Sequence, residues 1–338
     1  MKSIGKCYKP VLLGMFALML ICGTTWAADK QISIGTASAT GTYYPIGAAY
    51  AKVINDSVKG VYAVAEVTGG SVENMKLVST GNADIGLANQ MHFPIAVKGG
   101  APFNKPITNL RALFPLSGKK YVMKHAYQVV VLQDSDIHSL LDLKGKKVGV
   151  GPAGSGTEVY TKRIFQSLGM TYKDITPRFS SYTESVMAMQ DGNLDAMILH
   201  SAVPTGAVVE LGSTRKIRLV NLKEETIEKV MKDWGFNRKT IPAGSYEWQK
   251  EDATTVVSAH HAIFVNKDMD PELAYKLTKA AMEHKERIWA SNPAAKNFDE
   301  YGVELGHLVL PPLHPGAIKF FKEFGVKIPD SVIPPEAK

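Results

Sequence analysis

The sequence predicts an α/β protein built from two similar lobes. The first observation behind this prediction is a repeated order of elements, because strand, helix, strand, helix and strand follow one another in both halves of the chain. The second is size, since 338 residues, of which 45% are apolar, are enough for two hydrophobic cores. The βαβαβ order predicts parallel strands with right-handed crossovers and a ligand site at their carboxyl ends.

The first copy of the repeat lies near the start of the chain. Runs rich in β-branched and apolar residues predict its three strands, and apolar residues at helical spacing predict its two helices. The expected strands are 32–36, 61–67 and 83–88, and the expected helices are 42–57 and 71–80.

The second copy has the same order of elements. The expected strands are 147–151, 175–179 and 194–199, and the expected helices are 155–168 and 183–191. A Gly-Asn turn precedes the third strand in both copies, as GNAD at 81–84 and GNLD at 192–195. Because Asp84 and Asp195 occupy equivalent places, we expect both carboxylates to serve the fold rather than a ligand.

The chain between and after the two copies adds further elements. We expect a loop and a strand within 102–115, a strong strand at 127–132, another strand at 257–266, and helices at 271–290 and 316–324. The lobes would then comprise 28–117 and 264–338 for the first, and 118–263 for the second, with a hinge where the chain crosses between them.

The first 27 residues have the pattern of a cleaved signal peptide. Three lysines precede an apolar run at 11–22, and Thr25-Trp26-Ala27 is an acceptable cleavage site. We therefore expect a periplasmic protein that begins after Ala27. Cys7 and Cys22 are the only cysteines of the chain, so the mature protein would have neither a disulfide nor a cysteine-bound metal. Removal of the three lysines lowers the formal net charge from +7 by three, which gives no indication of nucleic-acid binding.

In each copy, a loop of small residues leads into the first helix. The backbone N–H groups at such helix starts are unpaired and lie at the positive end of the helix dipole, so they favour an anion. The candidate ligand-binding residues here are Gly41, Thr42, Tyr43, Gly154, Ser155, Gly156 and Thr157. A simple helix cap at Thr42, a surface aromatic at Tyr43 or Tyr44, and an ordinary turn at 154–157 remain alternatives.

Four further residues follow strands or begin the next helix. Ser71 and Asn74 lie one turn apart on one helix face, Gln90 follows the third strand of the first copy, and His200 follows that of the second. We include all four in the candidate ligand site. Helix capping is an equally good account of the first pair, and a structural histidine is an alternative for His200.

Catalytic patterns are weak in this sequence. Residues 149–154 fit GxGxxG with Asp174 about twenty residues on, which resembles a dinucleotide site. The segment lies in the middle of the chain, however, and an exported protein encounters little NAD. A P-loop fails because Thr157 replaces the lysine, and a nucleophile elbow fails because Ala153 replaces a glycine. We expect no enzyme, no cofactor and no metal site.

Five segments together resemble a known family. In order along nearly the whole mature chain they are TGTYYPIG at 40–47, TGGSVENMKLVSTGNADIGL at 68–87, GSGTE at 154–158, DGNLDAM at 191–197 and HPGAIKFFKE at 314–323. The combination resembles the TAXI-type solute receptors of TRAP transporters. It implies a type II periplasmic-binding-protein fold, a carboxylate ligand such as glutamate or glutamine, and delivery to TRAP permease subunits. The sequence departs from the common pattern at Ala37-Ser38-Ala39 and at His200-Ser201.

These observations lead to one functional hypothesis. We expect a monomeric exported receptor that captures a small carboxylate (glutamate, glutamine, a related dicarboxylate or a 2-oxoacid) when its lobes close about the hinge. It would pass the ligand to a membrane permease for uptake and would bind no nucleic acid. A receptor of an ATP-driven importer is the main alternative, and an NAD-dependent oxidoreductase is a weaker one.

Overall fold

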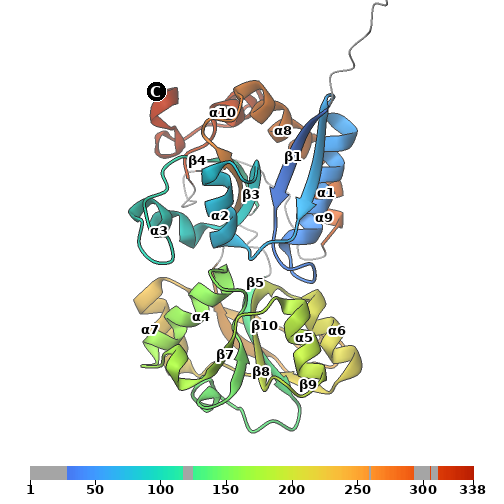
Figure 1. The fold of residues 1–338 in the computed structure, drawn as a ribbon, viewed down its shortest axis with the longest axis vertical. Helices are drawn as coiled ribbons and strands as arrows, with labels where there is room; N and C mark the ends of the chain where they lie inside the picture. Colours follow the sequence, from blue (N-terminus) through green and yellow to red (C-terminus); the bar gives the residue numbers. More distant parts are fainter. Residues whose placement is uncertain (1–28, 117–124, 259, 293–304, 306–310) are drawn as a thin grey trace, which may run out of the picture.

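Two α/β lobes, each with its own five-stranded sheet, make up the protein (Figure 1). The computed structural model describes residues 29–116, 125–258, 260–292, 305 and 311–338. The expected signal peptide and part of the first crossing between the lobes lie outside these residues. Within the described ranges, no helix combines the length and apolar character that a membrane span requires.

The sheet of the first lobe has the strand order β2-β1-β3-β12-β4. Strand β1 pairs in parallel with β2 and β3, as the repeat predicts, whereas β12 pairs antiparallel with β3 and β4. The bounds are β1 Lys30–Gly35, β2 Val61–Glu66, β3 Ile85–Asn89, β4 Leu110–Pro115 and β12 His261–Asn266.

The sheet of the second lobe repeats this arrangement with the order β7-β6-β8-β5-β9. Strand β6 pairs in parallel with β7 and β8, and β5 runs antiparallel between β8 and β9. The bounds are β5 His125–Leu132, β6 Lys147–Gly149, β7 Thr176–Arg178, β8 Ala196–Ala202 and β9 Ile217–Leu219. A separate hairpin joins β10 Asn237–Ile241 to β11 Ala253–Val257.

The prediction of wholly parallel sheets is therefore wrong for the strand that enters each sheet from the other lobe. In both sheets a strand that follows a crossing, β5 or β12, inserts beside the third strand of the repeat and runs against it. The predicted strand 257–266 begins at His261, so β12 spans the predicted boundary at 263 and belongs to the first sheet. The repeat pattern covers single βαβαβ units and says nothing about the direction of a strand that arrives from elsewhere.

Helices cover both faces of each sheet, and each face has its own apolar core. In the second lobe, α4 and α7 lie on one side and α5 and α6 on the other (Figure 1). The helices of the first lobe are α1 Tyr43–Ser57, α2 Ser71–Thr80, α3 Phe93–Lys98, α8 Pro271–Glu283, α9 Lys285–Ala290 and α10 Pro315–Glu323. Those of the second are α4 Gly156–Ser167, α5 Tyr182–Gln190, α6 Gly206–Thr214 and α7 Glu224–Trp234.

Short 3-10 helices connect several of these elements. Their bounds are η1 Gln90–His92, η2 Leu140–Leu143, η3 Tyr172–Asp174, η6 Asp330–Val332 and η7 Pro335–Ala337. The predicted helix 271–290 is divided in two, because the chain leaves helical geometry at His284, where φ is −120°.

Asp84 and Asp195 have the matching structural roles that the repeat predicts. The Asp84 carboxylate accepts a hydrogen bond from the Ser33 backbone N–H at 2.9 Å, and the Asp195 carboxylate accepts one from the Lys147 N–H at 2.6 Å. Each aspartate thus fastens the third strand of its copy to the first strand. The glycines that precede them, Gly81 and Gly192, have positive φ values of 75° and 71° and end the preceding helices.

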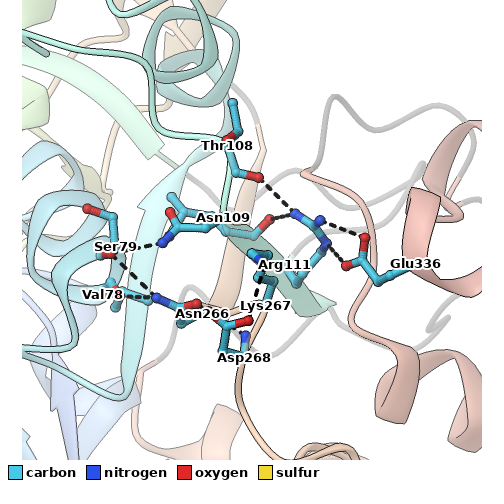
Figure 2. Close-up of polar contacts among 10 residues, drawn as sticks. Val78, Ser79, Thr108, Asn109, Arg111, Asn266, Lys267, Asp268 and Glu336 are labelled. Atoms are coloured by element: carbon cyan, nitrogen blue, oxygen red, sulfur yellow. Dashed lines mark hydrogen bonds and ion pairs between the residues drawn. The ribbon is translucent and has the colours of Figure 1, made fainter.

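A buried arginine fastens the C-terminal segment to the first lobe (Figure 2). The Arg111 guanidinium contacts both carboxylate oxygens of Glu336, at 2.5 and 2.9 Å. It also donates to the carbonyl oxygens of Thr108 and Leu110 at 3.0 and 2.8 Å. Arg111 is buried, whereas the Glu336 side chain is 37% exposed, so the pair lies at the edge of the core.

Removal of the Glu336 charge should therefore destabilise the first lobe. In Glu336→Gln the buried guanidinium loses its counter-charge, and we expect a loss of about 1–2 kcal/mol, between the values typical of exposed and buried pairs. Glu272→Gln is the matched control, because Glu272 and its partner Lys319 are both more than half exposed. Urea unfolding of both variants measures the difference. Equal stability losses would contradict a special role for the Arg111 pair.

Candidate ligand-binding site

A cavity of about 50 Å³ lies between the two lobes. Residues from the starts of α1, α2 and α4 meet there with residues from the carboxyl ends of β3 and β8. The lining residues are Ala37, Ser38, Gly41, Thr42, Tyr43, Gly69, Gly70, Ser71, Asn89, His125, Pro152, Ser155, Gly156, Thr157, Tyr160, Tyr182, His200 and Ser201. The two small-residue loops that the sequence singles out therefore both contribute to this cavity.

The second lobe contributes the first turn of α4. Ser155 is the N-cap residue, and its Oγ accepts a hydrogen bond from the Glu158 backbone N–H at 3.1 Å. The Thr157 hydroxyl lies 2.6 Å from the Tyr182 hydroxyl, which fixes the side of the helix start that faces the cavity. The remaining N–H groups of this first turn lie at the positive end of the helix dipole, where they favour a negatively charged group.

The first lobe contributes Thr42, and this residue bridges the lobes. Its Oγ1 accepts a hydrogen bond from the Ala202 backbone N–H at 2.9 Å and lies 2.8 Å from the Ser201 hydroxyl. It makes no side-chain cap to α1, so the simple-cap alternative is wrong. A second hydrogen bond between the lobes lies nearby, where the Thr40 carbonyl accepts from the Ala207 backbone N–H at 3.3 Å. The two lobes are thus in direct contact around the cavity.

Ser71 and Asn89 form the part of the lining that belongs to α2 and β3. The Ser71 hydroxyl accepts a hydrogen bond from the Asn89 backbone N–H at 3.1 Å. The Asn89 amide bonds to Ser258, which lies on the segment that returns from the second lobe, through contacts of 2.8 and 3.1 Å. These bonds couple the ligand-facing start of α2 to the crossing segment.

Tyrosine and histidine rings from both lobes form one wall. The Tyr43 hydroxyl lies 2.6 Å from His261 Nδ1, and the His261 and His125 ring centroids are 4.1 Å apart. The His125 centroid is 5.5 Å from that of His200, which in turn packs 4.6 Å from Tyr160. Neither His125 ring nitrogen has a hydrogen-bond partner among the described residues, and both nitrogens are buried within the wall.

Burial keeps these imidazoles neutral. It lowers the pKa of His200 to about 3 and that of His92, which stacks on Tyr160, also to about 3. Burial likewise holds the pKa of His125 and that of His261 well below the ordinary histidine value, with the neighbouring imidazoles as a further cause. The wall is therefore polar and uncharged at neutral pH.

The structure places eight of the predicted site residues in the cavity lining. They are Gly41, Thr42, Tyr43, Ser71, Ser155, Gly156, Thr157 and His200. The expectation that Tyr43 or Tyr44 faces the cleft is met by Tyr43, which is 7% exposed. Their role in ligand binding remains a prediction.

Three predicted residues lie elsewhere. The Asn74 amide nitrogen donates to the Thr36 and Leu87 carbonyls at 2.7 and 2.8 Å, so this side chain joins the ends of β1 and β3. Gly154 has a φ of +71° and serves the turn before α4 without lining the cavity. Gln90 faces a second, larger cavity.

Sequence reasoning missed several lining residues, and those with polar side chains are Ser38, Asn89, His125, Tyr160, Tyr182 and Ser201. His125 is the first residue of the buried strand β5, and a polar residue at the end of a buried strand is a usable signal. Tyr160 lies one turn into α4, on the face of Gly156 and Thr157, so helical spacing could have found it. Tyr182 begins α5, and its approach to Thr157 depends on tertiary packing.

No lysine, arginine, aspartate or glutamate is among the residues that line this cavity. An anion bound there would be stabilised by hydrogen bonds from backbone N–H groups and hydroxyls and by the helix dipoles. Across the described ranges, no three histidine, cysteine, aspartate or glutamate side chains are placed to hold a metal ion.

Comparison with known proteins gives a family and a fold. The sequence pattern of the NMT1-like family matches residues 34–325. A binding protein component of an ABC phosphonate transporter from Pseudomonas aeruginosa has a TM-score of 0.54 at 12% identity, with 78% of this chain and 79% of that chain covered. The chain has the two-lobed α/β fold of periplasmic binding proteins, as predicted.

Two further solved structures are similar at lower TM-scores. A protein from Bordetella bronchiseptica RB50 has a TM-score of 0.49 at 17% identity, covering 91% of this chain and 86% of that chain. The alkanesulfonate-binding protein SsuA from Xanthomonas axonopodis pv. citri, bound to MOPS, has a TM-score of 0.47 at 15% identity and covers 92% and 98%.

The buried histidines predict that stability falls in mild acid. Their folded-state pKa values lie below the unfolded value of about 6.5, so the unfolded chain binds more protons between that pH and the folded pKa. Stability should be fully present above about pH 6.5 and decline towards pH 3, by up to about 1.4 kcal/mol per pH unit for each histidine. Urea unfolding at a series of pH values measures the slope.

Two variants test the source of this slope. His125→Gln should lower the slope of unfolding free energy against pH by up to about 1.4 kcal/mol per pH unit, because one buried imidazole is removed. His138→Gln is the control, since His138 is exposed and should leave the slope unchanged. An unchanged slope in His125→Gln would contradict the explanation.

Proposed function

The chain belongs to the NMT1-like family, and from this premise we propose that it is an exported solute-binding receptor of a membrane importer. The observation that carries the proposal is the cavity between the lobes, which both small-residue helix starts enter from opposite sides. Each lobe supplies part of the lining, so a solute held there contacts both lobes at once. Neither lobe alone offers the complete site.

The proposed mechanism is hinge closure. A ligand that contacts both lobes has a higher affinity for the closed state and shifts the population towards it. The bonds of Thr42 to Ser201 and Ala202 form across the lobe boundary, so they are part of what closure gains. They do not involve the ligand directly. Closure would therefore report occupancy of the cavity to the membrane partner.

A small anion is the ligand class that the lining supports. Helix starts, hydroxyls and neutral imidazoles offer hydrogen-bond donors, and no carboxylate opposes a negative charge. A carboxylate such as glutamate, glutamine, a dicarboxylate or a 2-oxoacid is the candidate that the family resemblance suggests. The cavity of about 50 Å³ holds only about four water-sized groups, so the larger of these ligands require the lobes to stand slightly further apart.

Two kinds of importer could receive the ligand. The resemblance to TAXI-type receptors suggests TRAP permease subunits. The similarity to a binding protein component of an ABC phosphonate transporter supports an ATP-driven importer better. Uptake measured in cells with the ion gradient collapsed, or with ATP depleted, distinguishes the two. A periplasmic location follows from either proposal.

We do not propose an NAD-dependent oxidoreductase. Residues 149–154, which fit the dinucleotide pattern, lead into α4 beside the cavity of about 50 Å³. Pockets for ligands of drug size usually have about 300–1,000 Å³, so a dinucleotide has no room in this closed site. Binding without turnover is therefore the proposed activity.

The proposed receptor role predicts stabilisation by its ligand. The purified protein is heated with glutamate, glutamine, succinate, 2-oxoglutarate, methylphosphonate and, as an uncharged control, glucose. A ligand at about one hundred times its Kd should add about 2.7 kcal/mol to the free energy of unfolding. Stabilisation by an anion supports the proposal and indicates its class. Stabilisation by glucose alone, or by no compound after removal of ligand by refolding, would contradict it.

Hinge closure predicts that a side chain at Gly156 blocks binding. A Cβ there would lie 3.1 Å from His92 Nε2 and 3.2 Å from Ser71 Oγ, both on the opposite lobe. Gly156→Leu should hold the lobes apart. The affinity for the anion identified by thermal unfolding should fall by about tenfold or more, equivalent to about 1.4 kcal/mol. Thermal unfolding should change little, because the second lobe can accommodate the new side chain when open.

Gly100→Leu is the matched control for this variant. Gly100 is exposed, and the nearest atom to its Cβ position is 4.0 Å away. It should bind as the original protein does. Full affinity in Gly156→Leu would exclude the closed arrangement of the lobes as the binding state.

A further inference from the structure

A second cavity, of about 430 Å³, lies near the hinge and is lined by both lobes. Gln90 contributes to it from the first lobe, and Arg163, Asp233 and Trp234 contribute from the second. Gln90 is one of the predicted site residues, and the structure places it here and not in the small cavity. The proposed function makes no use of this space.

Gln90 is the first observation that points to a ligand. Its side chain is 3% exposed, and neither its amide oxygen nor its amide nitrogen has a hydrogen-bond partner among the described residues. Its backbone N–H is used, since it donates to the His260 carbonyl at 2.9 Å. Buried side-chain amides are nearly always paired in folded proteins. Both amide atoms of Gln90 have almost no accessible surface, so a partner in the cavity that this residue lines would reach them only after the side chain turns towards it.

Arg163 is the second observation. The guanidinium lies 5.0 Å from the centre of the Trp234 ring, and it forms no ion pair with any carboxylate of the described chain. Arginine stacked on an indole is held in place while its N–H groups remain free to bind a carboxylate in two-point contact. This is the cationic group that the small cavity lacks.

Asp233 supplies a charge of the opposite sign. One of its carboxylate oxygens accepts a hydrogen bond from the Ser167 hydroxyl at 2.7 Å, and the Trp234 indole N–H donates to the same hydroxyl at 3.1 Å. The carboxylate is therefore oriented by its neighbours and does not pair with Arg163. A cavity with one fixed cation and one fixed anion that do not neutralise each other suits a ligand that carries both charges.

Helix α4 contributes residues to both cavities. Gly156, Thr157 and Tyr160 of this helix line the small cavity, and Arg163 lies one turn further on in the large one. The Tyr160 ring stacks on His92 with centroids 5.0 Å apart, and His92 ends the short helix that begins with Gln90. Both lobes line the second cavity, so its occupancy depends on their relative position.

We propose that the second cavity binds a small zwitterion of the amino-acid type. Its carboxylate would pair with Arg163, its ammonium group would face Asp233, and its stem would lie against Trp234. The Gln90 side chain would turn towards the ligand and bond to one of its polar groups. This site is separate from the anion site of the proposed function. It has a positively and a negatively charged side chain, whereas the anion site has no charged side chain in its lining.

Tryptophan fluorescence and calorimetry together test this proposal. The full chain is titrated with each of the standard amino acids. The best binder is then compared with its amide, which lacks the carboxylate, and with its deaminated acid, which lacks the ammonium group. Both analogues should bind at least about tenfold more weakly than the amino acid, because each loses one charge pair. Because the deaminated acid can also occupy the small cavity, only binding that Arg163→Met abolishes is compared. An analogue whose Arg163-dependent binding equals that of the amino acid would overturn the proposal.

Variants locate the site. Arg163→Met keeps an apolar stem over Trp234 but removes the charge, and Asp233→Asn removes the opposite charge at similar size. Both variants should lower the affinity for the amino acid at least about tenfold, and Gln90→Leu should lower it less. Arg178→Met is the matched control, because Arg178 is exposed on β7 and lines neither cavity. Far-ultraviolet circular dichroism confirms that each variant is folded.

The result distinguishes this site from the proposed receptor site. Stabilisation by a simple anion should persist in Arg163→Met, because that ligand occupies the small cavity. If no amino acid binds, or if binding is unchanged in Arg163→Met and Asp233→Asn, the second site is overturned while the receptor proposal stands. If Arg163-dependent binding is found without any anion effect, the second site stands and the receptor proposal fails.

Discussion

The Thr42 hydroxyl is the contact on which the arrangement of the two lobes depends. It accepts from the Ala202 N–H and lies within hydrogen-bond distance of the Ser201 hydroxyl, so the start of the first helix of one lobe is joined to the last repeat strand of the other. Both partners are buried, and a buried polar atom that loses its partner is costly. The same residue lines the small cavity. The contact between the lobes therefore lies at the edge of the small cavity.

The polarity of the cleft comes from neutral groups. His125 and His200 reach it from the second lobe and Tyr43 from the first, and burial prevents both imidazoles from carrying a proton at neutral pH. A neutral imidazole has one donor and one acceptor, so it can bond to a ligand without fixing the ligand's charge. Charge selection then falls to the helix starts, whose dipoles favour an anion. Selectivity among anions would depend on shape and on these rings.

The fixed charges lie on the other side of the Tyr160–His92 stack. Arg163 and Asp233 flank Trp234 in the large cavity, whereas the residues around the small cavity carry no such groups. This separation has a physical reason, because an ionised side chain in a small closed cavity would lose its hydration with little in return. In the larger and more accessible cavity the same charges keep part of their contact with water. Helix α4 serves both cavities, so a change in its position would be felt in each.

The sequence by itself determined the elements whose signals are local. The two βαβαβ copies, the capping glycines Gly81 and Gly192, and the helix starts at Thr42 and Ser155 all follow from periodicity and turn chemistry over a few residues. Only the tertiary structure decided how distant segments meet. Thr42 and Ser201 are 159 positions apart, and the imidazoles of His92, His125, His200 and His261 come from four different segments. Their proximity, the antiparallel insertion of β5 and β12, and the placement of Gln90 in another cavity result from packing across the whole chain, which short-range patterns do not encode.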